Sequence, residues 1–147
     1  MKLKNKITTA SLISVISAHA SAQIVVPEFE FFEGSQGSED TVCNLTVLPG
    51  QVMNFNFKEI NCTNDEARSL IMRETPAGTI IKIYDDPKMS TNDDYLIIRV
   101  KQDIIEDYVV GTFEESYSDE SVDVTYKDHN GLDGKVSAAR IVVANID

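Results

Sequence analysis

Residues 62–70 read Cys-Thr-Asn-Asp-Glu-Ala-Arg-Ser-Leu, and a strand, a Gly-containing turn and a second strand follow as far as Pro87. The stretch combines a cysteine, an Asn64-Asp65 pair typical of a loop, and apolar β-branched runs typical of strands. It returns in altered form near the C-terminus, where residues 132–138 read Leu-Asp-Gly-Lys-Val-Ser-Ala. This recurrence predicts a fold built from two related halves.

The rest of the chain reads as short β-branched and aromatic runs, separated by polar turns about every 8–12 residues, with no amphipathic helix. Such a pattern is typical of an all-β sandwich or barrel. We expect a single domain over residues 23–147. The expected strands cover residues 23–32, 41–48, 51–57, 68–73, 79–84, 95–100, 108–113, 122–127 and 136–146.

Two local patterns predict how particular segments are placed. Residues 51–57 alternate, and we expect Met53, Phe55 and Phe57 to face the core because alternate side chains of a strand share one face. Residues 128–131 read Asp-His-Asn-Gly, and Asn-Gly tolerates the positive φ that tight hairpins require. We therefore expect a hairpin turn there.

The first 22 residues are predicted to be a signal peptide. Three lysines lie within the first six residues, and the uncharged run over residues 7–16 is too short to span a bilayer. Two A-x-A sites follow, and we expect cleavage after Ala22. No later run is long and apolar enough for a membrane span. The mature chain is therefore expected to be secreted or periplasmic.

The charge of the mature chain restricts its partners. The whole sequence has 13 Lys and Arg and 24 Asp and Glu, and removing three lysines with the signal peptide leaves (13 − 3) − 24 = −14. Nucleic acids and anionic membranes attract basic surfaces, so neither is an expected partner. The balance fits a soluble exported protein, a cation binder, or a partner protein with a basic surface.

The two cysteines, Cys43 and Cys62, are expected to form a disulfide, because an even pair in an exported chain is normally oxidised. Two free buried thiols are the alternative. A zinc site is a poor fit, since two sulfurs and one remaining histidine, His129, do not supply four suitable ligands.

The two halves correspond in two places. An aromatic residue followed by an acid ends a strand at residues 32–34 (Phe-Glu-Gly) and again at residues 84–86 (Tyr-Asp-Asp), an offset of 84 − 32 = 52. A polar turn precedes a strand at residues 64–70 and again at residues 133–139, an offset of 133 − 64 = 69. A duplication followed by drift explains both pairs.

With these motifs the chain resembles the βγ-crystallin superfamily. Members of that family build a domain from two Greek-key motifs packed as a β-sandwich. Each motif has an aromatic-acid corner near its start and an Asn/Asp-Asn/Asp-x-x-Ser/Thr-Ser loop near its end. The resemblance covers nearly all of residues 23–147, although its motifs are short.

The resemblance implies one weak Ca²⁺ site, because family members bind Ca²⁺ through these loops. Asn64, Asp65 and Glu66 (by its backbone carbonyl) would share the ion with Ser137, which suits a cation that prefers oxygen ligands. The chain departs from the pattern at the second site. There Gly134 follows Asp133 and offers no carboxylate, and Arg68 is a permanent cation where a hydroxyl is expected.

A purely structural interpretation of these loops stays open. Asx side chains bond their own backbone in turns without any metal. Arg68 would then pair with Asp65 or Asp133 and hold the two halves together.

We expect a binding or structural protein and not an enzyme. His129 lies in a turn without the motifs of a catalytic triad, and the repeated acid pairs read as solvated faces. The alternative is a secreted inhibitor or neutralising partner of a hydrolase or toxin, which would use the acidic loops at residues 85–94 and 114–120 to contact a basic face.

Overall fold

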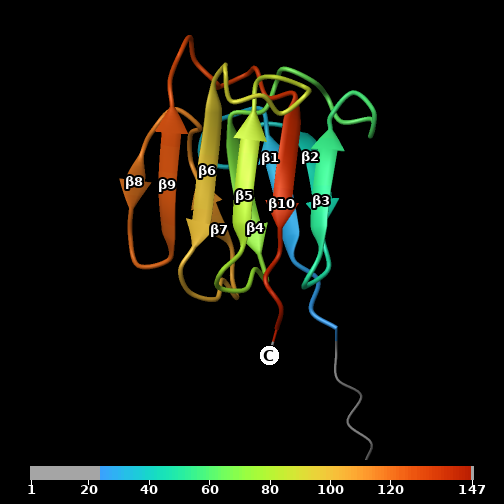
Figure 1. Ribbon diagram of the computed structural model, residues 1–147, viewed down its shortest axis with the longest axis vertical. Coiled ribbons are helices and arrows are strands. Elements are labelled where there is room, and N and C mark those ends of the chain that lie inside the picture. Colours follow the sequence, from blue (N-terminus) through green and yellow to red (C-terminus); the bar gives the residue numbers. More distant parts are fainter. Residues whose placement is uncertain (1–23, 147) are drawn as a thin grey trace, which may run out of the picture.

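Two antiparallel sheets packed face to face make up the computed structural model, which describes residues 24–146 (Figure 1). The expected signal peptide at residues 1–22 and its cleavage site lie outside the described residues. Within the described part there is no helix long and apolar enough to cross a membrane. The predicted all-β class is confirmed.

Ten strands form the two sheets. The four-stranded sheet has the order β2-β1-β4-β7, and the six-stranded sheet has the order β3-β10-β5-β6-β9-β8. The bounds are β1 Glu28–Phe32, β2 Thr41–Thr46, β3 Val52–Asn56, β4 Ser69–Arg73, β5 Ile80–Tyr84, β6 Tyr95–Val100, β7 Tyr108–Val110, β8 Tyr117–Ser118, β9 Val122–Lys127 and β10 Ala138–Val142.

The strand order shows two interlocked Greek keys. In the first half β1 lies between β2 and β4, and in the second half β5 lies between β6 and β10. One strand of each half crosses to the other sheet, so that β3 pairs with β10 and β7 pairs with β4. This exchange joins the halves into one sandwich, and the predicted fold is confirmed.

The core lies between the inner faces of the two sheets. Its largest fully buried side chains include four phenylalanines, and the rings of Phe31 and Phe57 meet edge to face with centroids 5.3 Å apart. Phe113 packs on the other side of Phe31, at 6.2 Å. Aromatic pairs of this kind contribute about 1 kcal/mol beyond their burial, so these rings link the loop ends to the core.

Two local expectations were wrong, and a third held in part. Met53 pairs with the buried Ile141 and so lies on the inner face as expected, but it is 39% exposed because β3 is an edge strand, whereas Phe57 is fully buried and Phe55 is partly buried. The acidic loop at residues 114–120 contains the short strand β8. The Asn-Gly turn at residues 128–131 is no hairpin, since β6 and β5 lie between β9 and β10 in the sheet.

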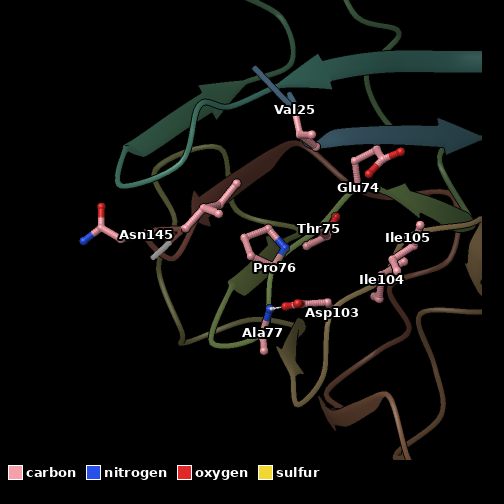
Figure 2. A pocket seen from close by; sticks show the side chains of 10 residues that line it. Val25, Glu74, Thr75, Pro76, Ala77, Asp103, Ile104, Ile105 and Asn145 are labelled. Carbon is pink, nitrogen blue, oxygen red and sulfur yellow. Dashed lines mark hydrogen bonds between the residues drawn. The ribbon is translucent and has the colours of Figure 1, made fainter. Parts of the chain in front are cut away.

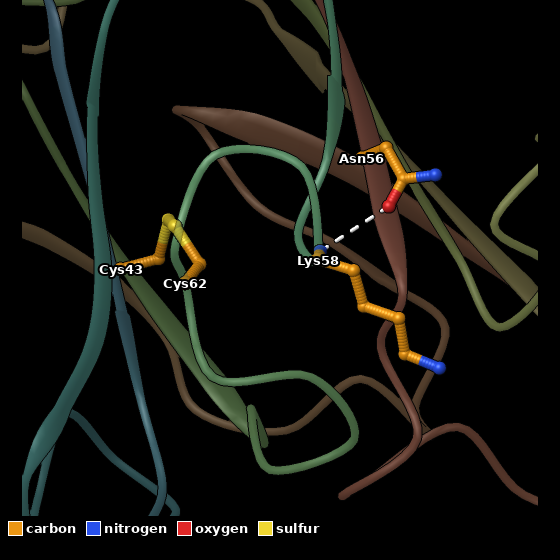
Figure 3. The surroundings of a disulfide bond; sticks show 4 residues. All are labelled: Cys43, Asn56, Lys58 and Cys62. Carbon is orange, nitrogen blue, oxygen red and sulfur yellow. Dashed lines mark hydrogen bonds between the residues drawn. A yellow bond between two sulfur atoms is a disulfide. The ribbon is translucent and has the colours of Figure 1, made fainter.

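The disulfide between Cys43 and Cys62 is formed, with the two Cα atoms 5.1 Å apart (Figure 3). It ties β2 to the loop that follows β3, and the amide of Thr63 donates to the carbonyl of Val42 beside it, at 3.4 Å. The loop therefore covers part of the edge of β2, which limits pairing with other chains. The alternative of two free thiols was wrong.

Candidate functional site

One end of the sandwich collects most of the acidic side chains. Five loops meet there, at residues 33–40, 57–68, 85–94, 111–116 and 128–137, and we call this region the acidic end. In Figure 1 it is the upper end of the molecule, opposite the C-terminus. The five loops hold fourteen Asp and Glu and four Lys and Arg, a net charge of 4 − 14 = −10.

The two halves of the chain contact each other at this end through matched backbone hydrogen bonds. The amide of Asp65 donates to the carbonyl of Val136 at 3.1 Å, and the amide of Gly134 donates to the carbonyl of Ala67 at 2.9 Å. Adding the offset of 69 to Asp65 gives Gly134, and adding it to Ala67 gives Val136. The two bonds therefore join equivalent positions of the two loops in opposite directions. The predicted correspondence between the loops thus has a structural counterpart.

A second matched pair connects each loop to the aromatic corner of its own half. The amide of Arg68 donates to the carbonyl of Phe32 at 2.8 Å, and the amide of Ser137 donates to the carbonyl of Tyr84 at 2.9 Å. Adding the loop offset of 69 to Arg68 gives Ser137, and adding the corner offset of 52 to Phe32 gives Tyr84. The two bonds are therefore equivalent in the two halves. Both loops are therefore held by backbone contacts, which leaves their side chains available for other contacts.

The structure brings Asp65 and Ser137 together. The Ser137 hydroxyl donates to Asp65 Oδ1 at 3.0 Å, and Asp65 has a φ of 62°, in the left-handed region that Asp tolerates better than most residues. Beside it, the amide oxygen of Asn64 is buried and has no hydrogen-bond donor among the described residues. A buried acceptor without a donor costs about 1–3 kcal/mol.

A hollow of about 230 Å³ opens beside Asp65. It is lined by Glu33, Glu39, Asp65, Glu66 and Arg68. A hydrogen bond with the Glu66 side chain raises the pKa of Glu33, and burial and the neighbouring acids raise it further. Four carboxylates and one guanidinium line the hollow, so its negative charge is only partly balanced. Glu66, expected to act through its backbone carbonyl, places its side chain there, and Glu33 is a lining residue that the sequence did not single out as a ligand.

The expected ion pairs of Arg68 are not formed. Within the described residues Arg68 makes no salt bridge to Asp65 or Asp133. Its guanidinium lies against Gly134, where an added Cβ would come within 3.2 Å of Nη2. The structural alternative in which Arg68 holds the halves together by ion pairing was wrong, because backbone bonds do this instead.

The second loop keeps its carboxylate inside the fold. Asp133 Oδ1 accepts from the amide of Phe113 at 2.8 Å, and Oδ2 accepts from the hydroxyl of Thr112 at 2.8 Å. The Asp133 carboxylate therefore fixes the turn after β7. This arrangement differs from that of Asp65, whose carboxylate faces the hollow.

A separate group of three carboxylates, from Asp85, Asp93 and Asp94, lies within 4.8 Å of one another. Asp94 is fully buried, so the interpretation of the Asp93-Asp94 pair as part of a solvated face was wrong for Asp94. Burial alone would raise the pKa of Asp94. Four hydrogen bonds nevertheless hold this pKa well below its usual range, and they come from the amide of His129, the Tyr126 hydroxyl and the amides of Asn130 and Gly131.

The opposite end of the sandwich carries a larger, more apolar hollow of about 430 Å³ (Figure 2). Its walls include Val25, Pro76, Ile104 and Ile105, and Ile105 is 72% exposed. Asp103 Oδ1 accepts from the amide of Ala77 at 2.8 Å and so fixes one wall. Glu74 is the second carboxylate of its lining.

Comparison with protein-family models, with curated proteins and with solved structures gave no match for this chain.

Proposed function

We propose that the protein is an exported, non-catalytic binding domain of βγ-crystallin-like type, which holds one weakly bound Ca²⁺ at the acidic end beside Asp65 and Ser137. The disulfide supports export, because such bonds persist in oxidising compartments. The internal two-fold relation between the loops supports a duplicated Greek-key domain.

The observation that carries this proposal is the buried amide oxygen of Asn64, which has no donor. Asn64 immediately precedes Asp65, which lines the hollow, and an oxygen without a proton donor suits a hard cation. Asp65 and Glu66 add carboxylate oxygens, and Ser137 adds a hydroxyl. These are the four residues that the resemblance implies, except that Glu66 would act through its carboxylate and not through its backbone carbonyl.

Two features keep the expected affinity low. Arg68 lines the same hollow, and its positive charge opposes a divalent cation. Ser137 already donates to Asp65, so the metal-free state is partly satisfied. We therefore place the site among the weak, extracellular class, with a Kd of about 10⁻⁴–10⁻³ M.

Thermal unfolding in excess EGTA, then in Ca²⁺, with Mg²⁺ as a control, tests the proposal. Ligand at about a hundred times its Kd stabilises by roughly 2.7 kcal/mol, a shift of several degrees for a domain of this size. Asp65→Ala removes the shift, whereas Glu59→Ala retains it, because Glu59 is exposed at the same end but does not line the hollow. An equal shift in both variants would overturn the assignment to Asp65.

The charge of the acidic end favours a second candidate, docking on a basic hydrolase or toxin. The loop at residues 85–94 lies at this end, but residues 114–120 run from it along β8 toward the opposite end. The proposed contact is therefore the acidic end itself and not the two loops together. Saturable inhibition of a basic hydrolase, unchanged by Ca²⁺ chelation, would support this candidate over the first.

A further inference from the structure

The outer face of the six-stranded sheet carries a charge opposite to that of the rest of the molecule. By strand register, Lys82, Arg99, Lys127 and Arg140 all lie on this face, and we call it the basic face. Asp123 is its one acidic residue, and Asp123 is engaged by Lys101 at 3.5 Å. In Figure 1 this sheet is the nearer layer, with β5 and β10 near its centre.

Two of these cations face each other directly. Arg140 and Lys82 are register partners on β10 and β5, and like charges in this relation destabilise a sheet. Arg140 donates to Asn54 Oδ1 at 3.0 Å, and within the described residues no carboxylate forms a salt bridge with either cation. An anion placed over this pair would remove the repulsion, so the face is complementary to a negatively charged partner.

The face is partly apolar. Ile80, Ile97 and Val142 share it with the cations and are half-buried. Its upper margin is covered, since Tyr84 lies on the outward side but is only 4% exposed, and the side-chain Nδ2 of Asn56 donates to the carbonyl of Pro87 in the loop above it, at 3.5 Å. From the spacing of strands and the rise per residue, the open part of the face spans roughly 20 by 15 Å. An area of this size suits a weak, transient contact.

We infer that the basic face is a docking surface for the acidic end of a second copy of this chain. The acidic end has a net charge of −10 and the basic face has four cations, so one chain carries both members of a complementary pair. A foreign polyanion would use the face but would be repelled by the acidic end. The contact is heterologous, end to face, and each copy offers one of each surface, so it builds rings or open rows and not a closed two-fold dimer.

Sedimentation velocity of the disulfide-bonded chain Gln23–Asp147, in EGTA, tests this inference. The average mass rises with protein concentration from about 10 μM to 1 mM in 50 mM salt and falls to that of the monomer in 500 mM salt, because screening shortens the Debye length from about 14 to 4 Å. A monomer at every concentration and salt level would overturn the inference.

Two double variants that change the net charge by the same amount distinguish the effect of the basic face from the effect of net charge. The double variant Lys82→Glu with Arg140→Glu weakens association at least tenfold, because like charges then oppose the acidic end. The control Lys58→Glu with Lys88→Glu changes exposed residues of the acidic end by the same total charge and strengthens association. Equal weakening of both variants would show that only net charge matters and would overturn the inference.

A mixing experiment tests the end-to-face geometry. Glu59→Lys with Glu115→Lys weakens the acidic end but keeps the basic face, and leaves the residues lining the hollow beside Asp65 unchanged. Mixed with the Lys82→Glu, Arg140→Glu variant, it forms a one-to-one complex that neither variant forms alone. If the mixture stays monomeric, or if the wild-type monomer retains poly-L-glutamate through Lys82 and Arg140 without self-association, the second-copy assignment is wrong. None of these variants alters Asp65, so failure here leaves the Ca²⁺ proposal standing.

Discussion

The hydroxyl of Ser137 donates a 3.0 Å hydrogen bond to Oδ1 of Asp65, joining two loops that lie 72 residues apart in the chain. It adds a side-chain contact to the backbone bonds that relate the halves. It also orients the carboxylate that faces the hollow. Structure and proposed ligand binding therefore depend on the same bond.

Replacing Ser137 with alanine removes this bond. We expect Ser137→Ala to lower the free energy of unfolding in EGTA by about 1 kcal/mol, the usual net value of such a bond. Urea unfolding measures the change. Ser35→Ala is the control, because Ser35 is exposed and its hydroxyl makes no hydrogen bond within the described residues, and it should change stability by less than about 0.5 kcal/mol. Equal losses would show that the Ser137–Asp65 bond contributes nothing.

Asp94 organises the loop at residues 128–131. Asp94→Ala leaves the amides of His129, Asn130 and Gly131 without their acceptor, and we expect a loss of about 3 kcal/mol at pH 7. Asp128→Ala is the matched control, since Asp128 is exposed and accepts only from Tyr126, at 3.0 Å. Its effect on urea unfolding should stay below about 1 kcal/mol.

The effect of Asp94 depends on pH in a defined direction. Its pKa is lowered in the folded state, so its contribution is fully present above the unfolded carboxyl's pKa of about 3.9 and is lost as the pH falls further. The stability difference between wild type and Asp94→Ala should therefore be constant near neutrality and shrink below about pH 4. A difference that grew on acidification would contradict the hydrogen-bonded carboxylate.

The strands were predictable because their signals are local. Alternation and turn residues located nine of the ten strands, and only the two-residue β8 was missed. The alternation gave the face on which Met53 lies but not its 39% exposure, because β3 turned out to be an edge strand and no local pattern records that.

Of the residues at the acidic end, the sequence singled out only those that lie in the repeated loops. The repeat supports the resemblance to βγ-crystallins, and it is the resemblance that implies that Asp65 and Ser137 lie together, as their hydrogen bond shows they do. The burial of Asp94 had no such signal, because the amides that bind it lie 35 to 37 residues along the chain. The same contacts explain why Asn130-Gly131 failed as a hairpin signal, since its amides serve Asp94 instead of a two-residue turn.

Glu114 fixes the neighbouring part of the acidic end. Its Oε1 accepts from the amides of Leu132 and Asp133, at 2.8 and 2.9 Å. We expect Glu114→Ala to destabilise the fold by about 1–2 kcal/mol and to speed amide exchange at these two positions. Glu115→Ala changes an exposed neighbour that makes no hydrogen bond within the described residues, so it should leave both measurements unchanged. Faster exchange in both variants would instead indicate a general charge effect.

The disulfide should stabilise the sandwich chiefly by restricting the unfolded chain. Cys43 and Cys62 are separated by 19 residues, and closing a loop of this length contributes about 3 kcal/mol. Reduction with dithiothreitol should therefore lower the free energy of urea unfolding by that amount. Cys43→Ala with Cys62→Ala is the control, because it lacks the bond and should not respond to dithiothreitol. Alanine avoids placing a hydroxyl at Cys43, which is only 4% exposed. If reduction left wild-type stability unchanged, the loop over the edge of β2 would be held by its packing and backbone bonds alone.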